Sequence, residues 1–272
     1  MMTTKTGPIE GYLHVEPTVT RDGDVAVIDS NGVYYRQLNE AIRGAFADGV
    51  KTVKLTNVNG QRYIGNGVTG KDLRIEIEGV PGGDMAMFMN GPTIVTSGNA
   101  QDGVANTMNA GAVYIDGDAG DVLGYGMRGG KVFVKGDVGY RVGIHMKAFE
   151  NLIPTVVCGG KARDFFGEYM AGGVLVLLGY ETQFAEQPLV GSFCGAGMHG
   201  GTIFLRGEVE PWQIGKECGI FTADEDDMKI LRPLVEEWAK AFDKDAEDVL
   251  SQPFTKLVPV SHRPYGKLYA PM

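Results

Sequence analysis

Three aspartates stand at the same distance from a methionine, six residues before it, and their carboxylates are the first candidates for chemistry. They are Asp102, Asp121 and Asp164. Carboxylates at equivalent places could bind a cation together or act as a general acid and base. Aspartate in a tight turn more commonly accepts hydrogen bonds from backbone N–H groups. We therefore interpret all three as turn caps.

The histidines and cysteines do not have the spacing of a metal site. His145 and His199 each adjoin a methionine, on opposite sides of it, in segments far apart in the sequence. Cys158, Cys194 and Cys218 are an odd number at long separations, which is typical of reduced thiols in a cytosolic protein. We therefore expect a cytoplasmic chain that binds no metal or cofactor itself.

Basic side chains recur in or next to the predicted turns, and Lys147 follows its methionine as Arg128 follows another. A solvated charged surface is the simplest interpretation. Guanidinium groups also suit protein interfaces and bind backbone carbonyls at loop ends. No catalytic, cofactor-binding or metal-binding residue is assigned. The candidates for an interface or for bracing a turn are Arg62, Arg128, Arg141, His145 and Lys147.

A repeat of 19 residues positions these side chains. Glycines mark the repeat, and ten residues after each early one comes a methionine or a replacement for it. Three residues before the methionine a small side chain recurs, which suits a tight turn. The glycines are Gly60, Gly79, Gly98, Gly117 and Gly136, continued by Gly160, Gly179 and Gly207; the methionines are Met89, Met108, Met127, Met146, Met170 and Met198, with Gly70 in the first place. Such self-similarity predicts stacked copies of one structural unit.

Short strands with one buried face are predicted before each marker glycine, where aliphatic residues stand four and two positions ahead of it. Nineteen residues hold two or three short strands and their turns but no crossover helix. This predicts an all-β fold, a single-stranded parallel β-helix of about seven coils in which equivalent residues stack into interior ladders. The first ladder is Ile75, Ile94, Val113, Val132, Val156, Leu175 and Ile203; the second is Ile77, Thr96, Ile115, Val134, Cys158, Leu177 and Leu205; the methionines form a third.

Both flanks are predicted to carry short α-helical caps for the open ends of the stack. Residues 36–47 have helical spacing of apolar side chains and precede Gly49, a stop signal. Thr222 and Glu225 are interpreted as a capping box, and Pro233 is expected to divide the next segment into helices 225–231 and 233–243. The chain then has three parts: an N-terminal cap (1–52), the β-helix (53–221), and a C-terminal cap and tail (222–272). The tail from residue 252 is expected to lie across another surface.

Charge and hydropathy limit the partners. The net charge is −9 and the pI is near 5.0, whereas nucleic acid or an anionic membrane as main partner requires clustered Lys and Arg. No apolar run of about 18 residues occurs, so no transmembrane helix is expected. The insertions between Met146 and Gly160 and between Gly179 and Met198 interrupt the repeat and are expected to project as loops. Partner contacts are predicted to concentrate there.

Several turns of the repeat carry distinctive sequence. They are residues 60–65 (GQRYIG), 98–103 (GNAQDG), 106–109 (NTMN), 127–130 (MRGG), 139–143 (GYRVG) and 167–173 (GEYMAGG). Together they closely resemble the GXGXG domain at the C-terminal end of the large subunit of glutamate synthase, in the form found as a separate chain where that synthase is split. The resemblance covers about residues 49–221.

This resemblance implies a right-handed parallel β-helix that acts as a scaffold without catalytic residues of its own. In that family a class II amidotransferase part, the glutaminase, releases ammonia, and a synthase part carries FMN and a 3Fe-4S cluster. This chain has neither part, so the resemblance implies partner subunits for both. The function hypothesis is a structural subunit of a glutamate synthase-type complex.

Other functions stay open at this point. Similar coils occur in a subunit of N-methylglutamate synthase and in formylmethanofuran dehydrogenase and formyltransferase-type complexes, of which the second group is less similar in sequence. A catalytic subunit using Asp164 and Glu168 near Arg141 is a hypothesis from a different class. A self-assembling scaffold with no enzyme partner is another.

Overall fold

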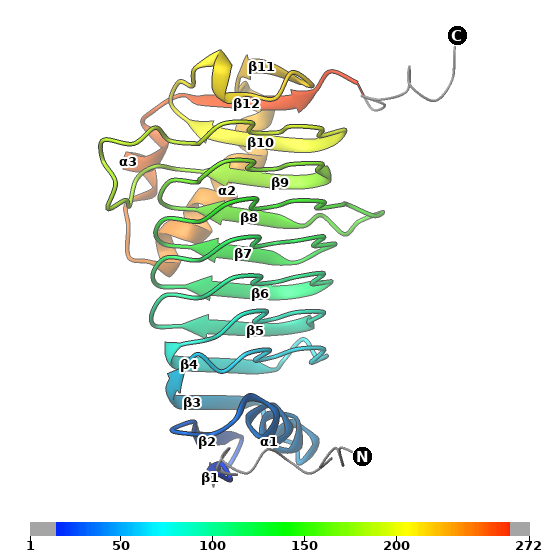
Figure 1. The fold of residues 1–272 in the computed structure, drawn as a ribbon, viewed down its shortest axis with the longest axis vertical. Helices are drawn as coiled ribbons and strands as arrows, with labels where there is room; N and C mark the ends of the chain where they lie inside the picture. The colour runs from blue at the N-terminus through cyan, green and yellow to red at the C-terminus, as the bar shows by residue number, and fades with distance from the viewer. Residues whose placement is uncertain (1–14, 262–272) are drawn as a thin grey trace, which may run out of the picture.

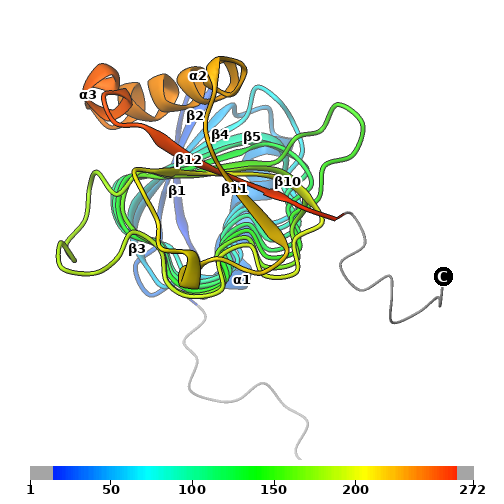
Figure 2. The same cartoon turned by 90° about the horizontal axis from the view of Figure 1, so that it is seen from above.

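The repeat folds into a right-handed parallel β-helix whose coils rise along one axis (Figures 1 and 2). Residues 15–261 are described by the structure, a computed structural model. The parallel strands pair in sequence order, each with the next, and form about six turns of solenoid, close to the expected number. They are β2 (Val25–Asp29), β3 (Thr52–Asn59), β4 (Arg74–Val80), β5 (Asn90–Thr96), β6 (Ala110–Ile115), β7 (Lys131–Val134), β8 (Thr155–Cys158), β9 (Ala171–Leu177) and β10 (Gly200–Arg206).

Both predicted strand ladders are confirmed by the pairing register. Ile75 is paired with Ile94, and the same step from strand to strand continues to Ile203; the second ladder is likewise in register. Every member of the first ladder is fully buried. The one hydroxyl in the second ladder, that of Thr96, donates to the Gly79 carbonyl at 3.3 Å, so no buried polar group is left unpaired there. The core is therefore a column of apolar side chains along the rod.

The N-terminal end is closed as the apolar pattern of residues 36–47 predicts. Helix α1 (Tyr35–Ala47) buries Leu38 and Ile42 against the first coil, and Gly49 follows it at φ 87°. Two strands precede the helix that the sequence pattern did not predict. β1 (Thr18–Asp22) and β2 form an antiparallel hairpin, and β2 continues the sheet in parallel with β3. The sheet thus begins inside the segment expected to be a cap.

The C-terminal side differs from the expectation in its helices. Helix α2 (Glu225–Ala241) continues through Pro233 without a break, so the division into two helices was wrong. Asp224, not Thr222, is the N-cap: its carboxylate accepts from the backbone of Asp226 and Asp227, and the Asp227 carboxylate accepts in return from Asp224 N–H at 3.0 Å. The capping box therefore begins two residues later than predicted.

Helix α2 lies on the outer face of the sheet rather than over the end of the rod (Figures 1 and 2). Trp238 is fully buried there, in one cluster with Phe133 and Phe204 of the sheet, and its indole N–H donates to the Val134 carbonyl at 2.8 Å. The short helix α3 (Ala246–Leu250) follows. A side helix held by a large buried aromatic stiffens the sheet over β7–β10.

The end of the rod is closed by strands. β12 (Phe254–Pro259), which the sequence assigned to a loose tail, inserts antiparallel between β10 and β11 (Cys218–Thr222). The one-turn helix η1 (Pro211–Gln213) lies at the same end. The part of the tail expectation that concerns residues 262–272 falls outside the described residues. None of the helices in the described part of the chain is long and apolar enough to span a membrane.

Candidate interface on the turn wall

Each coil contains a segment of consecutive turns that ends at the buried methionine, and we call the stack of these segments the turn wall. The segments are residues 63–68, 84–89, 103–108, 122–127, 141–146, 165–170 and 193–198. Val68, not Gly70, takes the methionine place in the first coil. Its carbonyl accepts from Asn90 N–H at 2.9 Å, as the Met89 carbonyl does from Asn109 N–H. The assignment of Gly70 from spacing alone was wrong by two residues, because β3 is longer than the later strands.

The backbone of the turn wall alternates in a way that few sequences tolerate. Residues five, three and one positions before the methionine have positive φ in every segment, including Val122 (51°) and Phe88 (55°). Such conformations cost about 1–3 kcal/mol at non-glycine residues and persist only where the surroundings fix them. Hydrogen bonds to both neighbouring coils fix them here: Arg141 N–H donates forward to Asp164 O, and Gly143 N–H donates backward to Leu123 O.

Only the middle position of the three is restricted in size. A Cβ on Gly143 would lie 2.7 Å from Leu175 Cδ1, and one on Gly167 would lie 2.5 Å from Ile203 Cδ1, so this position faces the first interior ladder. It therefore carries glycine or alanine in all seven segments. The outer two positions carry varied side chains. Function on this wall belongs to them.

Arg141, a predicted candidate, is held at the first outer position by residues of the next coil. Its guanidinium forms an ion pair with Glu168, a nearly buried carboxylate, and stacks over the Phe165 ring at 4.5 Å. A planar cation between a carboxylate and an aromatic face is fixed in orientation. Asp164, the other suggested catalytic acid, accepts a hydrogen bond from Ser192 N–H at 2.8 Å and is a turn cap.

His145, the second candidate, stands at the last outer position of the same segment. Its ring stacks on Tyr169 of the next coil, with centroids 5.3 Å apart and planes 13° apart. Tyr125 of the preceding coil meets the ring edge-on at 6.0 Å. All three side chains are exposed. The structure thus brings Arg141 and His145 into one cluster of cation and aromatic groups.

Arg62 lies apart from that cluster, near the N-terminal end of the wall. Its guanidinium pairs with Asp84 at 3.3 Å and covers the Tyr63 ring at 4.9 Å. Its carbonyl accepts from Asn39 of α1 at 2.9 Å. This residue therefore joins the terminal helix to the first turn segments, which is a bracing contact.

Arg128 and Lys147 are exposed at equivalent places in consecutive coils, directly after the methionine. Lys147 N–H donates to the Met127 carbonyl at 3.0 Å, so the two residues lie on neighbouring turns. They add positive charge beside the aromatic cluster around His145. In a chain with a net charge of −9, such a local concentration is distinctive.

The three aspartates interpreted as turn caps are confirmed in that role. Asp102 accepts from Asp121 N–H, and Asp121 accepts from Tyr140 N–H, each at 2.8 Å. A second ladder of the same kind, Asn99 to Asp118 to Asp137, was not predicted. These side chains join successive coils.

The thiols have no nucleophilic character. Burial raises the pKa of Cys158 and Cys194 well above the usual range, and it raises that of Cys218 to about 12. Thiolates are the reactive and ligating form. Within residues 15–261, no three His, Cys, Asp or Glu side chains gather as cation ligands.

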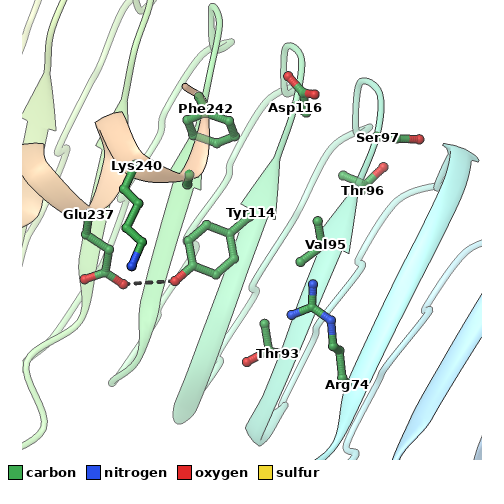
Figure 3. A pocket seen from close by; sticks show the side chains of 11 residues that line it. Arg74, Thr93, Val95, Thr96, Ser97, Tyr114, Asp116, Glu237, Lys240 and Phe242 are labelled. Carbon is green, nitrogen blue, oxygen red and sulfur yellow. Dashed lines mark hydrogen bonds between the residues drawn. The ribbon is translucent and has the colours of Figure 1, made fainter. Parts of the chain in front are cut away.

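A cleft of about 710 Å³ opens on the outer sheet face, beside the C-terminal end of α2 (Figure 3). Tyr114 points from β6 toward Glu237 of α2 and donates to it at 2.9 Å, and Lys131 pairs with the same carboxylate. Arg74 pairs with Glu76. Because these charges are compensated within the fold, the cleft offers no reactive group.

The aromatic residues of the turn wall are the functional candidates that the sequence reasoning missed. Phe165 stacks on Phe193 at 5.1 Å, and both stand five residues before a methionine, as Tyr63 does. Their shared register was the available signal. Exposed aromatic side chains next to arginine are the composition of protein interfaces rather than of active sites. The turn wall is therefore the candidate interface.

The comparisons agree with this fold. A family model described as the GXGXG motif matches residues 47–260. The chain is also 49% identical over 252 residues to the uncharacterized protein MJ1350 of Methanocaldococcus jannaschii, which covers 90% of this chain and 96% of that protein. In the turn wall, glycine or another residue of positive φ occupies every second position, which is the alternation that the motif's description states.

Proposed function

The chain belongs to the GXGXG-motif family, the domain type of glutamate synthase, and on that premise we propose that it is a non-catalytic structural subunit of a glutamate synthase-type complex. Such a complex forms L-glutamate from L-glutamine and 2-oxoglutarate. Family membership over residues 47–260 is the observation that carries the proposal.

Two partner subunits are part of the proposal. One is a glutaminase of the class II amidotransferase type, and the other is a synthase that holds FMN and a 3Fe-4S cluster. The donors of this chain do not fit an iron–sulfur cluster, which needs cysteine thiolates brought together. Cys158 lies in an interior ladder, and the described residues gather no three ligands. The cluster is therefore assigned to the partner.

The physical task of the subunit is to hold its partners at a fixed separation. One continuous sheet, two apolar ladders and hydrogen bonds from every turn segment to the adjoining coils make a stiff rod. A fixed distance between the ammonia-releasing site and the flavin site keeps the intermediate from equilibrating with bulk water. The cluster of Arg141, His145 and the adjoining aromatic rings is the proposed contact face.

Reconstitution tests the proposal. The two partner chains are assayed with and without this subunit for glutamate formed from glutamine, for glutamate formed from added ammonium, and for ammonia released to the medium. With the subunit present, we expect glutamine-dependent synthesis with little free ammonia; without it, ammonium-dependent synthesis persists and glutamine-derived ammonia escapes. Equal coupling without the subunit, or glutamate made by this chain alone, would contradict the proposal. Replacing 2-oxoglutarate and ammonia by glutamate and methylamine distinguishes the N-methylglutamate reaction.

A further inference from the structure

The two ends of the rod are finished differently. At the N-terminal end, α1 covers the core, and the edge strand β1 carries Arg21 and Asp22 with all five residues exposed. A charged edge with the core covered by a helix resists pairing with another chain. At the C-terminal end, no helix covers the core, because α2 lies on the side of the sheet. The last strand in the sheet order there is β11.

The outer edge of β11 presents unpaired main-chain groups. Among the described residues, β12 is the only strand paired with it. Val260 N–H donates to the Glu217 carbonyl, so odd-numbered residues of β11 bond toward β12. Ile220 and Thr222 therefore direct their N–H and C=O groups away from the sheet. Residues 218–222 (CGIFT) contain no charge that would block pairing.

Apolar side chains surround this edge. Ile220 is 44% exposed, Phe221 55%, Val260 67%, and Trp212 on η1 66%. A Cβ on Gly219 would lie 2.6 Å from the Phe221 ring and 3.3 Å from Val260, so these two side chains adjoin. The view along the rod shows β11, β12 and η1 on this end (Figure 2). An uncharged edge strand with exposed aromatic and aliphatic neighbours is a surface for association.

We propose that β11 pairs antiparallel with β11 of a second copy of this chain, which joins the two sheets into one across a two-fold axis. An antiparallel pair of identical strands is self-complementary and closes after two copies. The pairing is centred on Ile220, because its outward N–H and C=O then bond to Ile220 of the second copy in both directions. Thr222 N–H bonds to the Cys218 carbonyl of the other copy in the same register.

Charge favours this occupant. Antiparallel pairing about Ile220 sets residue 216 of one copy opposite residue 224 of the other. Lys216 thus meets Asp224, and this happens twice because of the symmetry. Pairing of β11 with β1 of another copy would instead bury Arg21 and Asp22 and would not close. A dimer at this end leaves the turn wall free, so the inference does not depend on the proposed function.

Sedimentation velocity of the full chain tests the dimer. The chain mass is 29.2 kDa, and we expect a species of twice this mass that dissociates on dilution. Ile220→Lys is expected to shift the population to monomer, because a charge would be buried at the axis. Val19→Lys, on the exposed edge strand β1, is the matched control and is expected to leave the dimer intact. A monomeric wild-type chain at 100 μM, or equal masses for Ile220→Lys and wild type, would overturn the proposal.

Cysteine cross-linking tests the register. Opposed residues of a hydrogen-bonded antiparallel pair have Cα atoms about 5.5 Å apart, within disulfide range. Ile220→Cys in a Cys218→Ser background is expected to form a disulfide-linked dimer under mild oxidation, and Phe221→Cys in the same background is not. Equal cross-linking by both variants would contradict this pairing. A chain ending at Ser261 is expected to dimerise as the full chain does; dimers that appear only after this truncation would assign the edge to residues 262–272 and overturn the proposal.

Discussion

The imidazole ring of His145 lies parallel to the ring of Tyr169, with centroids 5.3 Å apart, although 24 residues separate them in the sequence. Both stand one residue before a buried methionine, and both have positive φ. The stack of coils therefore places outward side chains of one position directly over one another. A row of rings held in this way loses little conformational entropy when a partner binds, which favours affinity.

His145→Gly is expected to weaken binding of the partner subunit about tenfold, which corresponds to about 1.4 kcal/mol. The folded chain should lose little stability, because removal of the ring contact is offset by relief of the positive φ at that position. Thr107→Gly, in the same position two coils earlier, is the matched control. Binding is measured by titration calorimetry and stability by urea unfolding. Equal effects of the two variants on binding would remove His145 from the interface.

Arg141→Ala is expected to destabilise the chain by about 1–2 kcal/mol. The Glu168 carboxylate is nearly buried and would lose its cation, but Arg141 is half exposed, so water screens part of the loss. The double variant Arg141→Ala, Glu168→Ala should recover part of the stability. The free energies of unfolding in urea give the coupling between the two. A coupling near zero would mean that the pair only orients the guanidinium for a partner.

Gly143→Ala is expected to cost at least about 3 kcal/mol, because the new Cβ would lie 2.7 Å from Leu175 in the first ladder. Gly126→Ala is the control. Gly126 also has positive φ, but its nearest neighbour would be Thr107 Oγ1 at 3.7 Å, so only the cost of about 1 kcal/mol for the backbone conformation applies. The difference between the urea midpoints isolates the interior contact. If both variants unfold together, the middle position does not face the core as described.

The interior ladders were predictable because a parallel stack copies one register from coil to coil. Ile75 and Ile203 are related by the same step that relates every pair between them, so the sequence period carries through the whole sheet. The turn wall was less predictable. Its positive φ values recur at Val122 and Phe88, residue types that do not indicate them, and they depend on hydrogen bonds to the neighbouring coils.

The C-terminal part was least predictable, because its positions are set by contacts far away in the sequence. β12 finds its place between β10 and β11 only once the last coil exists. Trp238 is buried by Phe133, more than a hundred residues earlier. The paired aromatic rings at Phe165 and Phe193 had a visible signal, their equal distance from a methionine. The identity of the partner that such a surface binds is not encoded in this register.

Stability should fall as the pH rises from about 10 to about 12, and Tyr114 should contribute to this fall. Burial and the neighbouring Glu237 carboxylate raise the pKa of Tyr114 to about 12. Its unfolded pKa is about 10, so above that pH the unfolded chain releases a proton that the folded chain retains. The contribution is complete below pH 10 and is lost by pH 12. Tyr114→Phe should flatten this part of the stability curve in urea unfolding, and an unchanged slope would refute the assignment.

Pro233→Ala is expected to stabilise the chain by about 1–2 kcal/mol. Proline within a helix removes one backbone hydrogen bond, at a cost of about 3 kcal/mol, and its restriction of the unfolded chain returns about 0.4–1 kcal/mol. The residue is exposed on α2, so alanine removes no buried contact. Lys229→Ala, also exposed on α2, is the control and should change stability by less than about 0.5 kcal/mol.

The opposite result would carry its own structural meaning. α2 buries Leu231 on one side of Pro233 and Trp238 on the other, and both pack on the curved outer face of a twisted sheet. If Pro233→Ala destabilises the chain while the helical circular dichroism increases, the bend at Pro233 is required for both side chains to reach the sheet. Increased stability with increased helicity shows instead that packing of Trp238 holds the helix together despite the proline.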